Sequence, residues 1–437
     1  MTDWSWSLDG PIVATAIACS VAAAIPGCFL VLRRMSLLGD AISHAVLPGL
    51  ALAFLISGSR SSGWMFVGAV VVGILTAFFT QWIHRVGNVD EGASMGVVFT
   101  TLFAIGLVLM VQAADQVDLD AGCVLYGSLD TVPLTGVDIG GWRLPRPFLV
   151  LTTVAVLNAL FVTVFFKELT LTSFDPSLAT TSGFSSRLIH YALMVVVAVT
   201  AVASFEAVGS VLVVAMMVIP PAAAYLCTDR LSVMIVLAAA IAVLSAVTGH
   251  LSAITVPRWV GFGSTTTAGM MAVSACVWLT MAMLFSPRHG WLPRWVRSRQ
   301  LSASIVRDDV VAFLYRMEER GQTVSGDLAT MQRVLAMPAA SLRRTLKRLE
   351  RVEAVRFVED RYRLTPTGRR FGQRLVRSHR LWETYLQDQA GTPDQRLHQR
   401  AEALEHFTDT ALGERLGEEV EVTVDPHGTR IPEDEED

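Results

Sequence analysis

Two groups of side chains in this 437-residue chain have the types and spacing of metal ligands. In the N-terminal part, Asp40 and His44 are four residues apart, so a helix would place both side chains on one face. A carboxylate oxygen and an imidazole nitrogen are donors that a borderline divalent metal ion accepts. A hydrogen-bonded pair that only holds two helices together has the same spacing, so spacing alone leaves both interpretations open.

The second group lies near the C-terminus and contains three imidazoles and three carboxylates within 28 residues. Its members are His379, Glu383, His398, Glu402, Glu405 and His406. The i,i+4 and i,i+3,i+4 spacings predict that each set converges on one helix face. This mixture of oxygen and nitrogen donors suits Mn²⁺, Fe²⁺ or Zn²⁺. An exposed helix pair with ordinary i,i+4 contacts is the alternative.

The composition shows which elements must position these side chains. The chain is 52% hydrophobic, and charge is divided unevenly along it. Residues 1–286 carry 24 charged side chains, whereas residues 287–437 carry 50. This division excludes a single soluble domain and a disordered chain, and it predicts a membrane part followed by an aqueous part. The five cysteines have no paired spacing, so neither a disulfide framework nor a thiolate metal site is expected.

Apolar runs of membrane-spanning length predict about nine transmembrane helices, with Asp40 and His44 at the start of the second. The runs are 11–32, 41–57, 64–83, 93–112, 148–166, 189–205, 208–226, 231–251 and 264–285. We expect Pro220-Pro221 to break the seventh. Basic residues in the loops predict an outside N-terminus and a cytoplasmic C-terminal part, in the cytoplasmic membrane. With eight or ten helices, the C-terminal part would lie outside instead of in the cytoplasm.

Beyond the transmembrane domain (1–286), we expect an interfacial linker (287–304), a winged helix-turn-helix domain (305–370) and a helical metal-binding and dimerisation domain (371–437). The predicted helices are 306–320, 325–335 and 338–352, followed by a hairpin that turns at Glu359-Asp360. The basic side chains of the third helix include Arg343, Arg344 and Lys347. They fit either a DNA major groove or a solvated basic face.

The stretch from Ser36 to Gly49 resembles the signature of the zinc/manganese/iron-type ABC importer permeases. Further ordered matches stand at Glu91–Gly96, Leu125–Leu129, Ser173–Ala179 and Val208–Ala222. The resemblance implies a type II ABC importer-like, all-α permease that works as a homodimer or heterodimer. It also implies that an extracytoplasmic metal-binding protein delivers the ion, and that Asp40 and His44 line the metal path.

The polar segment from Lys167 to Arg187 resembles the coupling helix that docks on the ATPase in this family. The resemblance makes Phe174 the apolar anchor and Asp175 a helix cap or polar contact; an amphipathic surface turn is the alternative. The chain has no G-x-x-x-x-G-K-[ST] sequence. We therefore expect no nucleotide on this chain, no enzyme activity of its own, and a separate ATPase subunit.

Residues 305–433 resemble the diphtheria-toxin-repressor-like, metal-dependent repressors, which dimerise through this segment. The match implies a primary metal site at Asp309, Glu402, Glu405 and His406. It also implies an ancillary site at His379, Glu383 and His398. Two departures concern the primary site: Ala312 replaces a second carboxylate of the manganese branch, and Glu402 replaces a cysteine of the iron branch.

Together these features predict a permease for Mn²⁺, Zn²⁺ or Fe²⁺ whose fused cytoplasmic domain senses the metal and regulates transport. Three alternatives stay open. The chain could be a membrane-tethered, metal-responsive DNA-binding regulator, the C-terminal fold could serve only in dimerisation, or the permease could carry a metal chelate.

Overall fold

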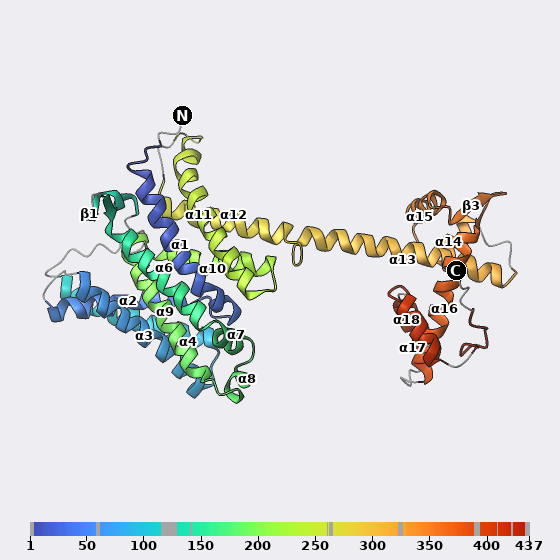
Figure 1. The fold of residues 1–437 in the computed structure, drawn as a ribbon, viewed down its shortest axis with the longest axis horizontal. Helices are drawn as coiled ribbons and strands as arrows, with labels where there is room; N and C mark the ends of the chain where they lie inside the picture. Colours follow the sequence, from blue (N-terminus) through green and yellow to red (C-terminus); the bar gives the residue numbers. More distant parts are fainter. Residues whose placement is uncertain are drawn as a thin grey trace. The chain divides into compact units, whose positions relative to one another are not determined.

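The computed structural model describes residues 4–57, 62–114, 129–139, 142–259, 261, 265–321, 327–388, 394–408, 410–420 and 423–432. The chain divides into two compact units, residues 1–294 and residues 295–437. The first unit is a bundle of helices, and the second contains helices and one hairpin (Figure 1).

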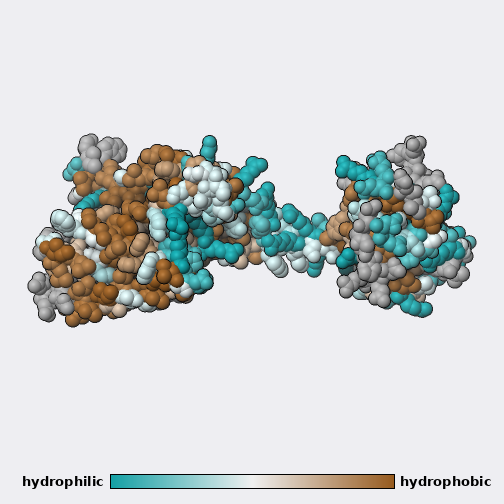
Figure 2. Space-filling model, turned by 90° about the horizontal axis from the view of Figure 1, so that it is seen from below, coloured by the Kyte–Doolittle hydropathy of each residue, from teal (hydrophilic) through white to brown (hydrophobic). Residues whose placement is uncertain are grey.

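Nine helices in the described part of the chain are long and apolar enough to cross a membrane, which confirms the predicted number there. They are α1 (Asp9–Leu32), α2 (Leu38–Ser57), α3 (Ser62–Gly87), α4 (Glu91–Ala114), α6 (Arg146–Val164), α9 (Ser186–Val208), α10 (Ser210–Cys227), α11 (Leu231–Trp259) and α12 (Thr267–Phe285). Hydrophobic side chains cover much of the outer surface of this unit, shown brown in Figure 2. That surface is suited to lipid rather than to water.

Helix α1 lies at the centre of the first unit, packed against α6, α10 and α11 (Figure 1). Its alanines at 16, 22, 23 and 24 are fully buried. Small residues let neighbouring backbones approach closely, and this packing holds membrane helices together because lipid provides little hydrophobic drive between them.

The expected break at Pro220-Pro221 is wrong, because α10 runs through both prolines as one helix. Proline lacks an N–H, so Pro221 cannot donate a hydrogen bond to the carbonyl of Met217. That carbonyl faces Gly27 of α1, where an added Cβ would lie 2.1 Å from its oxygen. The glycine therefore makes room for α1 beside the freed carbonyl, and packing between the helices keeps α10 continuous.

Shorter elements connect the spans. The helix η1 (Leu129–Leu134) precedes an antiparallel hairpin of β1 (Gly136–Ile139) and β2 (Trp142–Pro145). Helices α7 (Phe166–Phe174) and α8 (Pro176–Thr181) lie between α6 and α9. Residues 125–128 of the predicted motif at Leu125–Leu129 lie outside the described residues.

Helix α13 (Trp291–Glu319) is a single helix where the sequence predicted a linker up to residue 304 and a helix from 306. The only proline of this helix, Pro293, stands in its first turn, where a missing N–H leaves no intrahelical bond unmade. No glycine or proline follows before the helix ends at Glu319, so nothing in the sequence interrupts it.

The second unit contains the predicted winged helix-turn-helix elements. Helices α14 (Leu328–Val334) and α15 (Ala339–Arg351) precede the antiparallel strands β3 (Val355–Val358) and β4 (Arg361–Leu364). Leu342, Leu346 and Leu349 of α15 are buried against Val310 and Leu314 of α13. The hairpin turns at Glu359 and Asp360, whose φ angles of 53° and 65° fit a two-residue turn of the left-handed type.

The last three helices form the end of the second unit. Helix α16 (Pro366–Asp388) packs against α17 (Asp394–Glu405) and α18 (Thr410–Glu419). Leu381, Leu416, Val420 and Ile431 form a small apolar cluster beside them. The long helix α16 therefore joins the wing to the segment that carries most of the predicted cytoplasmic metal ligands.

Candidate metal sites

The predicted pair in the membrane unit lies on one face of α2. Nε2 of His44 is 3.5 Å from Oδ1 of Asp40, and the two side chains are 41% and 47% exposed in the single chain. The His44 ring lies 5.8 Å from Phe99 and 6.0 Å from Phe103, centre to centre, both on α4. The pair is thus held beside an aromatic wall while its donor atoms remain open on the other side.

Close backbone contacts fix α2 in place. A Cβ on Gly49 would lie 2.4 Å from the carbonyl oxygen of Gly68 on α3, and a Cβ on Gly106 of α4 would lie 2.7 Å from Cδ of Pro48. Larger side chains would push these helices apart. Glycines therefore position the helix that carries Asp40 and His44 between α3 and α4.

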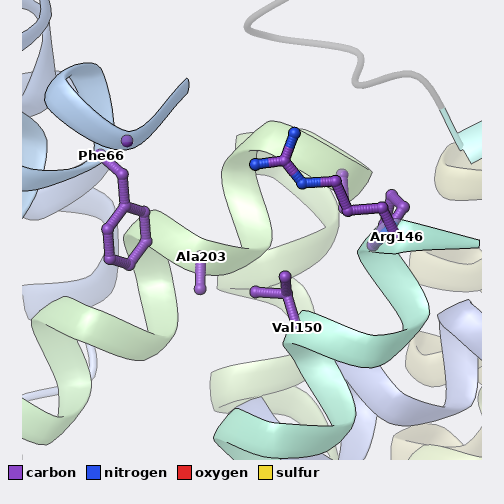
Figure 3. Close-up of a pocket in the computed structure, with 7 residues that line it drawn as sticks. Phe66, Arg146, Val150 and Ala203 are labelled. Carbon is purple, nitrogen blue, oxygen red and sulfur yellow. The ribbon is translucent and has the colours of Figure 1, made fainter. Parts of the chain in front are cut away.

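A cavity of about 270 Å³ lies elsewhere in the membrane unit, between α3, α6 and α9. Figure 3 shows Phe66, Val150 and Ala203 on its walls, with Arg146 beside them. The described residues of its lining include no carboxylate, imidazole or thiol, and they include the cationic guanidinium. These walls suit an apolar group and are unsuited to a metal cation.

In the second unit, His379 and Glu383 of α16 meet His398 of α17. Nε2 of His379 is 3.1 Å from both Oε1 of Glu383 and Nδ1 of His398, and Nδ1 of His398 is 2.9 Å from the same carboxylate oxygen. We call these three residues the first ligand group. Their donor atoms lie within 4.8 Å of one another, which is close enough for one ion to contact all three.

A second ligand group joins Asp309 of α13 to Glu405 and His406 at the end of α17. Nε2 of His406 is 3.4 Å from Oδ1 of Asp309 and 3.9 Å from Oε1 of Glu405. Asp308, which the sequence analysis did not name, places Oδ2 3.5 Å from Nδ1 of His406. This group therefore combines residues almost 100 positions apart in the chain.

Glu402 is not brought into either ligand group among the described residues, which differs from the prediction. The prediction assumed one helix through residue 406, but α17 ends at Glu405 and His406 stands in the following turn. Glu405 is buried there, while Glu402 is exposed. Glu402 shares α17 with Glu405, but its exposed side chain does not join the buried donors, so helical spacing alone did not identify which carboxylate faces them.

His427 approaches the first ligand group and was not named as a ligand by the sequence analysis. Its Nε2 is 3.7 Å from Oε1 of Glu383. Oδ1 of Asp425 accepts hydrogen bonds from the backbone N–H groups of His427 and Thr429, which shapes a turn with Gly428 at φ 79°. The Asp-Pro-His-Gly sequence signals this turn, but its position beside Glu383 depends on the tertiary fold.

Three buried atoms test whether these residues fit a metal ion. Nδ1 of His379 and Oε2 of Glu405 form no well-aligned hydrogen bond but lie 2.6 Å apart as an ion pair, and Nδ1 of His406, likewise without a well-aligned bond to a described residue, is 3.5 Å from Oδ2 of Asp308. Buried polar atoms usually have such a partner, and a cation is one explanation for those that do not. The imidazole and carboxylate donors, together with these atoms, fit a divalent transition metal.

The electrostatics of the two groups agree with their geometry. Burial alone would raise the pKa of Glu383, but hydrogen bonds with His379 and His398 lower it to about 2. The neighbouring carboxylates of Asp308 and Asp309 raise the pKa of His406 to about 10. Burial works against protonation of His379, but Glu383 and Glu405 outweigh it and raise its pKa. The clustered carboxylates thus favour the protonated, positively charged forms of His379 and His406.

Phe174 and Asp175 stand at the junction of α7 and α8. Phe174 ends α7 with its side chain 64% exposed. Asp175 is the N-cap of α8, because Oδ1 accepts hydrogen bonds from the backbone N–H groups of Ser177 and Leu178. These bonds lower the pKa of the Asp175 carboxyl. The junction therefore presents one aromatic side chain beside a capped helix start.

The predicted basic residues Arg343, Arg344 and Lys347 lie on α15 and are exposed. The opposite side of that helix is buried in the winged-helix core. The arrangement leaves a positively charged face on the helix that corresponds to a recognition helix.

Comparison with known proteins gives the same division of the chain. Residues 10–286 match the "ABC 3 transport family". Residues 365–433 match the "Iron dependent repressor, metal binding and dimerisation domain". The second unit thus carries a metal-dependent repressor domain of this type.

The chain is 43% identical over 297 residues to the manganese transport system membrane protein MntD of Bacillus subtilis, covering 67% of this chain and 97% of the relative. It is 37% identical to the zinc transport system membrane protein TroD of Treponema pallidum, covering 72% and 83%. The solved PsaBC structure from Streptococcus pneumoniae, in complex with Fab, is 29% identical with a TM-score of 0.53, covering 65% and 93%. With a family match over most of its length, the chain belongs to the ABC 3 transport family.

Proposed function

We propose that this chain is the permease subunit of an ABC importer that carries a bare divalent transition-metal ion, Mn²⁺, Zn²⁺ or Fe²⁺, across the cytoplasmic membrane. The observation that carries the proposal is the Asp40–His44 pair. Its oxygen and nitrogen donors lie 3.5 Å apart on a membrane helix, and both side chains are almost half exposed. An open pair of this kind can exchange an ion's water for side-chain donors, whereas a purely structural pair would be buried between helices.

The importer needs further chains. A separate ATPase supplies the energy, and we assign its docking site to the α7–α8 junction, where Phe174 projects. An extracytoplasmic metal-binding protein delivers the ion, and a second permease subunit, like or unlike this one, completes the passage. The N-terminus lies outside and the C-terminal unit in the cytoplasm, as the basic residues of the loops indicate.

The C-terminal unit acts as a metal sensor in this proposal. The first ligand group would hold an ion with His379, Glu383 and His398, and the second with Asp309, Glu405 and His406. Carboxylates gathered at one site repel one another without a cation and are drawn together by one. Cytoplasmic metal would thereby order this unit and reduce further uptake.

A DNA-binding regulator is the second candidate, favoured by the exposed basic face of α15. It predicts sequence-selective, salt-dependent binding of duplex DNA by the purified full chain, lost on substitution of Arg343 and Arg344. A domain that only dimerises predicts instead that Glu405→Ala with His406→Ala leaves uptake unchanged at every metal concentration.

The experiment for the main proposal is uptake into right-side-out vesicles, loaded with ATP, that contain this chain assembled with its ATPase. Radiolabelled Mn²⁺ is offered with its binding protein, with excess Zn²⁺ or Fe²⁺ as competitors, and in parallel a radiolabelled metal chelate such as a corrinoid. ATP-dependent uptake of the bare ion supports the proposal. If only the chelate is taken up, the proposal is wrong and the chain is a permease for a metal chelate.

A further inference from the structure

The guanidinium of Arg33 joins three helices of the membrane unit. Arg33 is the residue immediately after α1. Its Nε donates to Oγ of Ser173 at 3.0 Å, and a terminal nitrogen donates to Oγ1 of Thr172 at 2.8 Å, both on α7. The other terminal nitrogen lies 3.3 Å from Nδ1 of His190 on α9. One side chain therefore links the end of α1 to α7 and α9.

The directions of these hydrogen bonds are fixed by the hydroxyl groups. Oγ1 of Thr172 donates its own hydrogen to the carbonyl of Glu168, and Oγ of Ser173 donates to the carbonyl of Leu169. Both hydroxyl oxygens are thus left as acceptors for Arg33. A guanidinium presents several N–H donors in a rigid plane, whereas the ammonium group of lysine cannot reach three such partners in the same arrangement.

On its other side, Arg33 is connected to the Asp40–His44 pair by a short, hydrogen-bonded turn. The backbone N–H of Met35 donates to the carbonyl of Leu30, and that of Leu38 donates to Met35. Met35 is buried, and Arg34 has a φ of 61°. Helix α2 begins at Leu38, so Asp40 is its third residue. Few backbone torsions in this turn are free to absorb a displacement of Arg33.

We propose that Arg33 is a positioning residue that transmits movement of the α7–α8 segment to the Asp40–His44 pair. The inference rests on the proposed function, because it takes α7–α8 as the ATPase docking segment and Asp40–His44 as the metal path. When the ATPase displaces α7, the hydrogen bonds that Arg33 donates to Thr172 and Ser173 pull on Arg33, and the turn after α1 carries the displacement into the start of α2. Arg33 touches neither ATP nor the transported ion.

The alternative is that Arg33 only stabilises the bundle, and the ratio of metal transported to ATP hydrolysed separates the two roles. In proteoliposomes with the assembled complex, we expect Arg33→Lys to lower this ratio about tenfold, the size of effect typical for residues along a coupled network. ATP hydrolysis, assembly with the ATPase and the melting temperature should stay near wild type. Arg34→Lys is the matched control, since Arg34 is the exposed neighbour, and it should leave the ratio unchanged.

A second pair of variants tests the other side of the link. Thr172→Val combined with Ser173→Ala removes both acceptors and should lower the ratio of metal to ATP as much as Arg33→Lys does. Adding Arg33→Lys to this double variant should lower the ratio no further. Thr170→Val on the same helix is the control, because among the described residues the Thr170 hydroxyl donates to the carbonyl of Phe166 within α7 and not to another helix. This pair remains informative if Arg33→Lys fails to assemble.

The outcomes separate this inference from the proposed function. If the wild-type complex transports no bare metal ion, the proposed function fails first. If the wild type transports metal and both the Arg33 variant and the Thr172–Ser173 variant keep the wild-type ratio of metal to ATP, only the role of Arg33 is overturned.

Discussion

Nδ1 of His379 lies 2.6 Å from Oε2 of Glu405, so a member of the first ligand group contacts a member of the second. The other nitrogen of the same ring faces Glu383 and His398. His379 thus has one nitrogen directed at each group. An ion bound at one group fixes this ring and thereby changes the donor set that the other group offers.

Glu405→Gln should weaken metal binding at both ligand groups. The substitution removes a carboxylate from the second group and the charge next to His379 in the first. We expect each of the two dissociation constants to rise about tenfold, as losses beside metal ligands commonly do. Titration of the detergent-purified chain against a competing chelator measures both steps. Glu402→Gln is the matched control, and a similar loss in that variant would restore Glu402 as a ligand.

His427→Ala should weaken binding at the first ligand group alone. With His427, this group offers three imidazoles and one carboxylate, a set that suits tetrahedral Zn²⁺. We expect about a tenfold loss of Zn²⁺ affinity in the same titration. His289→Ala, which removes a partly exposed histidine paired with Asp229, should have no effect. Equal Zn²⁺ affinity in both variants would show that His427 is not a ligand.

Metal binding should release protons, because the pKa of His406 is raised to about 10 and the ring is therefore protonated at neutral pH. The stabilisation from this protonated ring is complete below the ordinary pKa of histidine, and it is lost as pH rises through about 10. An ion at the second ligand group needs the neutral ring, so its affinity should fall as pH falls.

Calorimetry in two buffers of different ionisation enthalpy measures this release. We expect about one proton per ion from His406, and His406→Gln should remove it. A binding enthalpy that is independent of the buffer would contradict the assigned protonation.

Phe174→Ala should weaken association with the ATPase about tenfold, because it removes an exposed aromatic anchor. Asp175→Ala should also weaken it, since α8 loses its N-cap, whereas Asp175→Ser keeps a capping oxygen and should bind almost normally. Co-purification at graded salt, or surface binding of the two purified components, gives the affinities. Wild-type association of Phe174→Ala would move the docking site elsewhere.

The sequence predicted what depends on local pattern. Helical spacing correctly placed Asp40 and His44 on one face, and the turn residues Glu359 and Asp360 correctly marked the wing. Predictions from the sequence were wrong where tertiary contacts determine the local structure. Packing of Gly27 against α10 keeps a helix continuous through two prolines.

The cytoplasmic sites show the same limit. Glu402 and Glu405 share α17, but Glu402 is exposed and Glu405 is buried beside the other ligands, which their helical spacing did not reveal. Asp308 and His427 reach the two groups from distant segments, and neither position carries a spacing that could have revealed it. The contact of Arg33 with Thr172 and Ser173 spans about 140 positions and is equally invisible in sequence.

The central claim is that a bare divalent ion passes the Asp40–His44 pair, and ATP-dependent uptake of radiolabelled Mn²⁺ by Asp40→Asn vesicles tests it most directly. Asp9→Asn is the matched control, because Asp9 also faces a histidine, His250, at 3.0 Å in the same unit. We predict that Asp40→Asn abolishes uptake while the ATPase still assembles, and that Asp9→Asn retains it. Wild-type uptake by Asp40→Asn would contradict the account.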